Sequence, residues 1–167
     1  MKSEKLGGRR AAVMAAALAC GSLLQAAPQA SEADQAFVAK VSQGGLYEVE
    51  AGKVAAMRAT MPVVKNFGIL ESHDHTGVNS NLKRIATMTG VTIAPGLNAE
   101  FSERLAKLKA VPAAQFDDYY VGDMKQIHNK DEGLFKQEAQ EGSEPYKQFA
   151  HQTAVLVNAH LGWLNTL

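Results

Sequence analysis

Three prolines divide the 167-residue chain into stretches that are each long enough for one helix. Pro62, Pro112 and Pro145 each precede a run in which apolar residues recur with the helical period, and proline is favoured in the first turn of a helix. No alternating run of β-branched residues competes with this interpretation. The pattern predicts four long helices, over residues 34–60, 62–89, 112–141 and 145–166.

The connections between these predicted helices determine how they are arranged. Only residue 61 separates the first two helices, and Gly142-Ser143-Glu144 joins the last two, so each pair forms an antiparallel hairpin. Residues 90–111 separate the hairpins, and apolar residues at helical spacing predict a short amphipathic helix within this segment. Gly90 and Gly142 stand where helix-ending glycines are favoured. Two hairpins joined by one long crossover define the ferritin-like variant of the all-α four-helix bundle.

Composition excludes several classes of function. Lysine plus arginine and aspartate plus glutamate both number 17, so no basic excess indicates a nucleic-acid partner. A single cysteine excludes both a disulfide framework and a cysteine-rich zinc site. The chain has no glycine-rich phosphate loop and no Ser-His-Asp arrangement, so a nucleotide-binding or hydrolase function has no support.

The first thirty residues have the pattern of a secretory signal peptide. A basic start precedes an uncharged run from Ala11 to Ala27, which is too short and too interrupted to indicate a membrane span. Two variants stay open: a twin-arginine signal built on Arg9-Arg10, and a lipoprotein signal in which Cys20 is lipidated and attaches the protein to the outer membrane. We therefore expect a periplasmic or secreted domain over residues 31–167, with a net charge of −3.

Each predicted long helix carries one ligand-capable polar residue on its inward, apolar face. Placed at about 100° per residue, these residues are Glu48, His75, His128 and His160. Three lie near the midpoints of their helices and His160 about one turn beyond, so helices of equal length would bring them to one level. One carboxylate and three imidazoles in an apolar bundle predict a mononuclear site for a transition metal: zinc, copper, iron or nickel. The absence of a Glu-x-x-His pair argues against a di-iron centre.

Other interpretations of these residues stay open. An inward histidine is commonly a hydrogen-bonded core residue, so the alternative is a metal-free structural or interaction module of the periplasm or outer membrane. A metal-dependent oxidoreductase would further require an open coordination position and access for a substrate. Met124 shares a face with His128, where its thioether would favour Cu(I), although core filling is the commoner role of a methionine. Gly44-Gly45 within the first helix indicates either a close neighbouring helix or a local bend.

Several motifs resemble one family of bacterial proteins. They are QGGLYEVEAGKVA around Glu48, Asp74-His75, FDDYYVGDMKQIH ending at His128, and the late His160. In order and spacing they are similar to the exported, ferritin-like proteins grouped as domain of unknown function family 4142, over Phe37 to Leu167. The resemblance implies a periplasmic or outer-membrane-associated four-helix bundle in which the four predicted ligands match recurrent polar positions, and it implies no reaction. Glu71 stands where such proteins often carry methionine, which would add a hard oxygen ligand and disfavour copper.

Overall fold

The computed structural model describes residues 29–167, and within them the chain forms five helices and no strand. The predicted signal peptide lies almost wholly outside the described residues, as do Cys20 and Arg9-Arg10. Among the described helices, none combines the length and the apolar character that crossing a membrane requires. The helices are α1 (Glu32–Arg58), α2 (Pro62–Thr89), α3 (Ala99–Ala110), α4 (Ala113–Glu141) and α5 (Tyr146–Leu164). All four predicted long helices and the predicted short helix are confirmed, with ends that differ by two residues at most.

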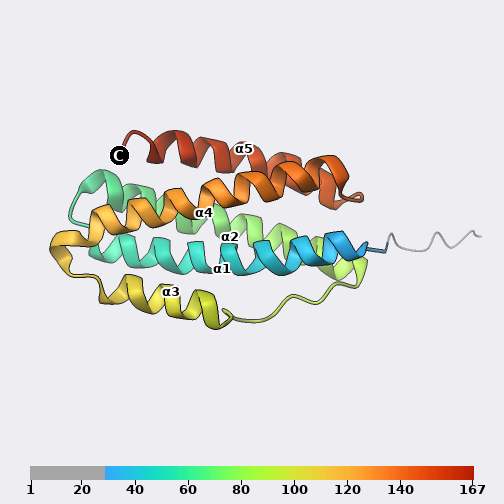
Figure 1. Cartoon of the computed structure of the whole chain (residues 1–167), viewed down its shortest axis with the longest axis horizontal. Helices are drawn as coiled ribbons and strands as arrows, with labels where there is room; N and C mark the ends of the chain where they lie inside the picture. Colours follow the sequence, from blue (N-terminus) through green and yellow to red (C-terminus); the bar gives the residue numbers. More distant parts are fainter. Residues whose placement is uncertain (1–28) are drawn as a thin grey trace, which may run out of the picture.

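The crossover follows from the direction of the helices (Figure 1). α1 and α2 form one antiparallel hairpin, α4 and α5 form the other, and α2 ends at the opposite end of the bundle from the start of α4. The chain between them must therefore travel the whole length of the bundle. It does so through an extended stretch and then α3, which lies along the side of α1 and α4. The fold is a four-helix bundle with one long crossover, as predicted.

Helix ends confirm part of the sequence interpretation and correct part of it. Pro62 occupies the first turn of α2, and Gly90 ends that helix in the left-handed conformation with φ of 75°. Pro112 and Pro145 instead stand one position before their helices, as the capping residues. Gly142 follows α4 with φ of −63° and ψ of 159°, which is not the left-handed conformation. Gly142 is favoured here because a larger residue has no room: a Cβ at this position would lie 2.6 Å from the Glu138 carbonyl oxygen.

Glycines bring the first two helices unusually close together. A Cβ on Gly52 would lie 2.6 Å from the carbonyl oxygen of Gly68, and a Cβ on Gly68 would lie 2.7 Å from the Cβ of Ala55. A Cβ on Gly45 would overlap the side chain of Asn79, whereas one on Gly44 would make only ordinary contacts. The close approach predicted from the glycine pair is therefore real for Gly45, and it is tightest at Gly52.

Two apolar clusters fill the bundle, one toward each end. Tyr47, Phe67 and Tyr120 belong to the first, and Phe37, Leu82 and Phe149 belong to the second. The residues between these clusters along the helices are the buried glutamates and histidines of the predicted site. The core is thus interrupted at mid-length by a polar layer.

Candidate metal centre

Five ionisable side chains from four helices meet in this polar layer. Glu48 comes from α1, Glu71 and His75 from α2, His128 from α4 and His160 from α5. Each is at most 2% exposed. Groups of this kind are rarely buried unless they pair with one another or hold a metal, because removing a charge from water costs several kcal/mol.

Three ring nitrogens and one carboxylate converge at the centre of the layer. The Glu71 carboxylate lies 3.3 Å from Nε2 of His75, 3.5 Å from Nε2 of His128 and 3.0 Å from Nδ1 of His160. Nε2 of His128 and Nδ1 of His160 are 3.2 Å apart. One donor atom from each of these four residues lies within 4.8 Å of the other three, in an arrangement that could hold a metal ion.

In two of the rings, the nitrogen that points away from the centre (the outer nitrogen) faces a hydrogen-bond acceptor. This acceptor determines which of the two ring nitrogens carries the proton. Nδ1 of His75 lies 3.0 Å from the Glu48 carboxylate, and Nδ1 of His128 lies 3.0 Å from the backbone carbonyl of Met124. Carboxylates and carbonyls only accept hydrogen bonds at neutral pH, so each outer nitrogen donates its N–H. In the neutral ring the inner Nε2 of each histidine then carries a lone pair.

His160 is held in the same way but with its two nitrogens exchanged. Its outer Nε2 donates to the Asp74 carboxylate at 3.1 Å, which leaves the lone pair of Nδ1 facing the centre. The inner nitrogens of His128 and His160 are therefore both acceptors in the neutral rings, although they lie only 3.2 Å apart. Two acceptors at this distance, beside a carboxylate, require a proton or a metal ion between them.

Without a metal, protons supply that positive charge. Burial alone lowers the pKa of His75, but the negative charges of Glu48 and Glu71 outweigh burial and raise it to about 10. Burial raises the pKa of Glu48, yet the His75 charge and hydrogen bond bring it down to about 2. The pKa of His160 is also raised, because the Glu71 carboxylate 3.0 Å from its Nδ1 outweighs its burial. In the metal-free protein, His75 is therefore an imidazolium paired with the Glu48 carboxylate.

Several polar atoms in this layer still lack a hydrogen bond. Among fully buried side-chain atoms of the described residues, those without a hydrogen-bond partner include Oε1 of Glu48, both oxygens of Glu71 and Nε2 of His75. The Tyr120 hydroxyl, about two helical turns before His128 on α4 and within the neighbouring apolar cluster, is also without a partner. Unsatisfied buried atoms are rare in native proteins, so their concentration here indicates a group that the layer is built to receive.

All four residues predicted from the sequence lie in the cluster, but not in equivalent places. His75, His128 and His160 point a nitrogen at the centre, whereas Glu48 lies against the outer nitrogens, 3.0 Å from Nδ1 of His75 and 3.5 Å from Nδ1 of His128. The carboxylate at the centre belongs to Glu71, which shares a face of α2 with His75 at a spacing of four residues. The sequence signals for Glu71 were this spacing and its place where similar proteins often carry methionine, from which an added oxygen ligand was expected.

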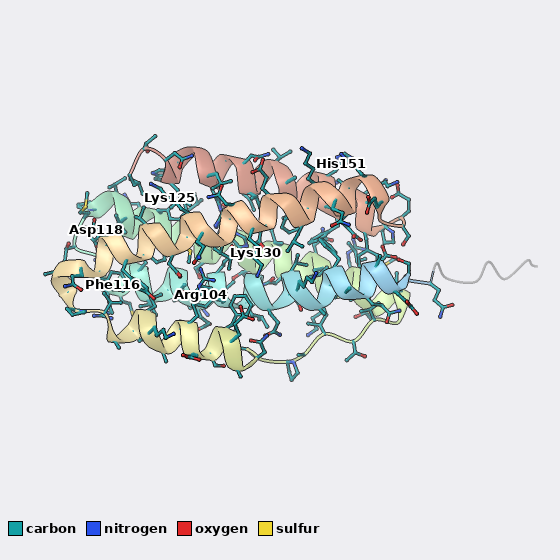
Figure 2. The ribbon with its side chains drawn as sticks, in the orientation of Figure 1. Arg104, Phe116, Asp118, Lys125, Lys130 and His151 are labelled. Carbon is teal, nitrogen blue, oxygen red and sulfur yellow. The ribbon has the colours of Figure 1, made fainter. Side chains whose placement is uncertain are left out.

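The remaining histidines and the other polar residues near these positions lie outside the central group of donors. His73 and His151 are exposed, and His151 lies on the outer side of α5 (Figure 2). Met124 packs in the apolar core and contributes its carbonyl to His128. Asp131 is buried outside the central group of donors, and burial together with the negative charge of Glu48 raises its pKa to about 8. Asp74, which holds His160, was not recognised as a site residue from the sequence.

Comparison with known proteins gives one family match and one similar fold. The profile described as Domain of unknown function (DUF4142) matches residues 22–167. No curated protein matches. Among solved structures, a fragment of a DUF305 protein from Deinococcus radiodurans is similar, with a TM-score of 0.71 and 14% sequence identity, over 84% of this chain and 100% of that one. At this identity the likeness shows the fold alone.

Proposed function

Since this chain belongs to the DUF4142 family, as its motifs indicated, and the description of that family states no activity, we propose a function from the buried cluster itself. The protein binds one transition-metal ion in the core of its helical bundle, for storage, buffering or stress protection in the cell envelope. The observation that carries this proposal is the convergence of three imidazole nitrogens and one carboxylate, because in the neutral rings all three nitrogens offer a lone pair to the same centre.

The spacing of the donors fits a single ion. Metal–nitrogen and metal–oxygen bonds of about 2.1 Å place tetrahedral donors about 3.4 Å apart and neighbouring octahedral donors about 3.0 Å apart. Four separations among Glu71, His75, His128 and His160 run from 3.0 to 3.5 Å, and one donor atom of each residue lies within 4.8 Å of the others. The four donors can therefore surround one ion once the more distant pairs move closer together.

We propose that Glu71 and the three histidines are the ligands and that Glu48 is a positioning residue. Glu48 would fix the His75 ring by accepting from its Nδ1, as carboxylates commonly do for metal-bound histidines. A divalent ion would also neutralise the two buried glutamates, a charge that protons on the rings balance in its absence. Three imidazoles with one carboxylate suit zinc, iron, nickel or Cu(II) better than Cu(I), which prefers sulfur ligands.

Metal content tests this proposal. The mature protein would be purified without a histidine tag and its metal measured by mass spectrometry, beside His128→Ala, His160→Ala and the exposed control His151→Ala. We expect near-stoichiometric metal in the wild type and in His151→Ala, and its loss in the two core variants. Absence of metal, with no uptake of added zinc, copper, iron or nickel, would leave the metal-free structural or interaction module as the function.

The two glutamates can be distinguished by their isosteric amides. Glu71→Gln removes a ligand and is expected to abolish stoichiometric binding. Glu48→Gln keeps the ligand set and is expected to weaken affinity by about 10- to 100-fold while one ion still binds at saturation. Equal loss of stoichiometry in both variants would make Glu48 a ligand as well. In the wild type, a chelator should also lower the melting temperature, because metal that binds only the folded state stabilises it.

We further propose that the protein is exported, to the periplasm or beyond. This rests on the basic start and apolar run of residues 1–30. Cell fractionation, with the intact mass of the mature chain, tests it and gives the cleavage site. A mass increase that corresponds to acyl chains on Cys20 would identify a lipoprotein, and full-length protein in the cytoplasm would refute export.

A further inference from the structure

We propose that the metal ion reaches and leaves the core at the seam between α2 and α5, where Asp74 connects His160 with solvent. This inference rests on the metal-binding function proposed above. It assigns to Asp74 a role in capturing a transition-metal cation, and to His160 the role of the ligand that moves.

Asp74 is the part of the site that solvent reaches. The carboxylates of Glu48 and Glu71 and all three rings are 0–2% exposed, whereas the Asp74 side chain is 22% exposed. Its Oδ2 nevertheless accepts from Nε2 of His160 at 3.1 Å. One carboxylate therefore touches both bulk water and a ring whose other nitrogen faces the centre.

The other two rings offer no comparable path. The outer nitrogen of His75 faces Glu48, which is 1% exposed, and that of His128 faces the carbonyl of Met124, which is fully buried. Neither contact continues to the surface. His160 differs because its hydrogen-bond partner is itself partly solvated, so breaking one hydrogen bond frees the ring to turn.

Aromatic packing limits the direction in which His160 can turn. The Phe67 ring meets the His160 ring edge-on, with 5.6 Å between centroids, and Trp163 meets Phe67 in the same manner. These side chains fill the adjoining turn of the bundle. On the inner side, Oε2 of Glu71 lies 3.0 Å from Nδ1 of His160, so an ion carried by the ring would meet the central carboxylate next.

A competing route lies on the opposite side of the molecule, beneath α3. A pocket of about 190 Å³ opens there between α1, α3 and α4, and its lining includes Gly44 and the buried Asp131. Lys40, Arg104 and Lys130 also line it, together with Glu100, and Arg104 and Lys130 are labelled in Figure 2. The lining therefore has no excess of acidic side chains that would attract a metal cation.

The position of Glu48 also disfavours the pocket as a route. Glu48 comes from α1, the helix that lines the pocket, and it faces the outer nitrogens of His75 and His128. An ion approaching from that side would be separated from the lone pairs by the Glu48 carboxylate and by N–H groups, which cannot bind a cation. The lone pairs point the other way, toward Glu71 and His160.

The uptake sequence balances in ligands and protons. The Asp74 carboxylate first replaces a water on the hydrated cation, and its hydrogen bond from His160 breaks. Nδ1 of His160 then replaces a second water and releases any proton it carries to solvent. The ring returns to its packed position, and the inner nitrogens of the remaining two histidines release any protons they carry to solvent. These nitrogens and Glu71 replace further waters and complete the coordination, while Asp74 again accepts from Nε2–H. Release follows the same steps in reverse.

Metal-uptake kinetics test the route. Metal-free full-length mature protein would be mixed with Zn²⁺ in a stopped-flow instrument, with a chromophoric zinc indicator as the readout, and stoichiometry would be measured separately. We expect Asp74→Asn to slow association about 10-fold or more with stoichiometry unchanged, since local negative charge raises the association rate of cations by about 10- to 1,000-fold. Asp74→Glu should restore the rate to within about threefold. Asp131→Asn and the exposed control Asp118→Asn should stay within about twofold of the wild type.

Each outcome of this experiment either supports or overturns the proposed uptake route through Asp74. An unchanged association rate in Asp74→Asn overturns the route, and a slowed Asp131→Asn assigns uptake to the pocket beneath α3 instead. If Asp74→Asn accelerates release but leaves association unchanged, Asp74 only positions the ring, which also overturns its role in capture. A wild type that takes up no zinc or other metal refutes the proposed function itself, so the two failures are distinguishable.

Discussion

Replacing Gly52 by alanine should separate α1 from α2, because the added methyl group has no room between them. Its Cβ would lie 2.6 Å from the Gly68 carbonyl oxygen and 2.8 Å from the Ser72 amide nitrogen, both backbone atoms that cannot rotate away. An ordinary contact begins at 3.4 Å, so the helices must move apart by about 0.8 Å at this point.

The size of the effect follows from two opposing terms. Alanine in place of glycine within a helix contributes about 1 kcal/mol of stability, whereas overpacking of this kind costs typically 1–3 kcal/mol and more against rigid backbone. We expect a net loss of about 1–2 kcal/mol for Gly52→Ala. Gly77→Ala is the matched control, because a Cβ there meets nothing within 4 Å and the substitution should stabilise by about 0.5–1 kcal/mol.

Urea denaturation of the metal-free protein, followed by circular dichroism, measures both variants under the same conditions. The retreat of α1 should also lengthen the 3.0 Å contact between Glu48 and His75 to about 3.8 Å, beyond hydrogen-bond range, and so weaken metal binding. If Gly52→Ala is as stable as Gly77→Ala to within about 0.5 kcal/mol, the close crossing does not limit the packing of α1 on α2, and the reasoning fails.

Two further predictions concern buried carboxyl groups. Burial and the negative charge of Asp34 raise the pKa of Glu138 to about 7, from an ordinary value of 4.5, so the unfolded chain loses its proton first as pH rises. Wild-type stability should therefore fall between pH 4.5 and 7 relative to Glu138→Gln, which urea titrations at several pH values would measure; parallel curves would contradict this. Asp117 accepts hydrogen bonds from the Thr60 amide and hydroxyl and from the Met61 amide at the start of α2. Asp117→Ala should cost about 2–3 kcal/mol in the same assay, against less than about 0.5 kcal/mol for its exposed neighbour in Asp118→Ala; similar losses in both would show that this cap contributes little.

The helices and their order could be predicted from the sequence because their signals are local. Proline, glycine and the 3.6-residue period act within a turn or two of the residue concerned, so Pro62 and Gly90 mark the ends of α2 without knowledge of the fold. The long crossover could also be predicted, because the many residues between the second and third long helices are enough to return along the whole bundle. The reason for a glycine at position 142, after the end of α4, could not be predicted in this way. It depends on the lack of space beside Glu138, which exists only in the folded chain.

The inward direction of the three histidines could also be predicted from the local sequence. Helical periodicity places His75, His128 and His160 on apolar faces, and all three are buried. Periodicity does not say which ring nitrogen faces the centre, because that depends on the acceptor beside the other nitrogen. For His128 the acceptor is a carbonyl of its own helix, and for His160 it is Asp74, 86 residues away in the chain.

The carboxylate at the centre was decided by tertiary structure alone. Glu48 and Glu71 both lie on inward faces, and the sequence favoured Glu48 because it stands near the middle of its helix. Which of them reaches the lone pairs depends on the offset and separation of α1 and α2, which the close contact between Gly52 and Gly68 constrains. Helical periodicity describes each helix by itself and carries no information about this offset, so it could not distinguish the central carboxylate from the one that faces the outer nitrogens.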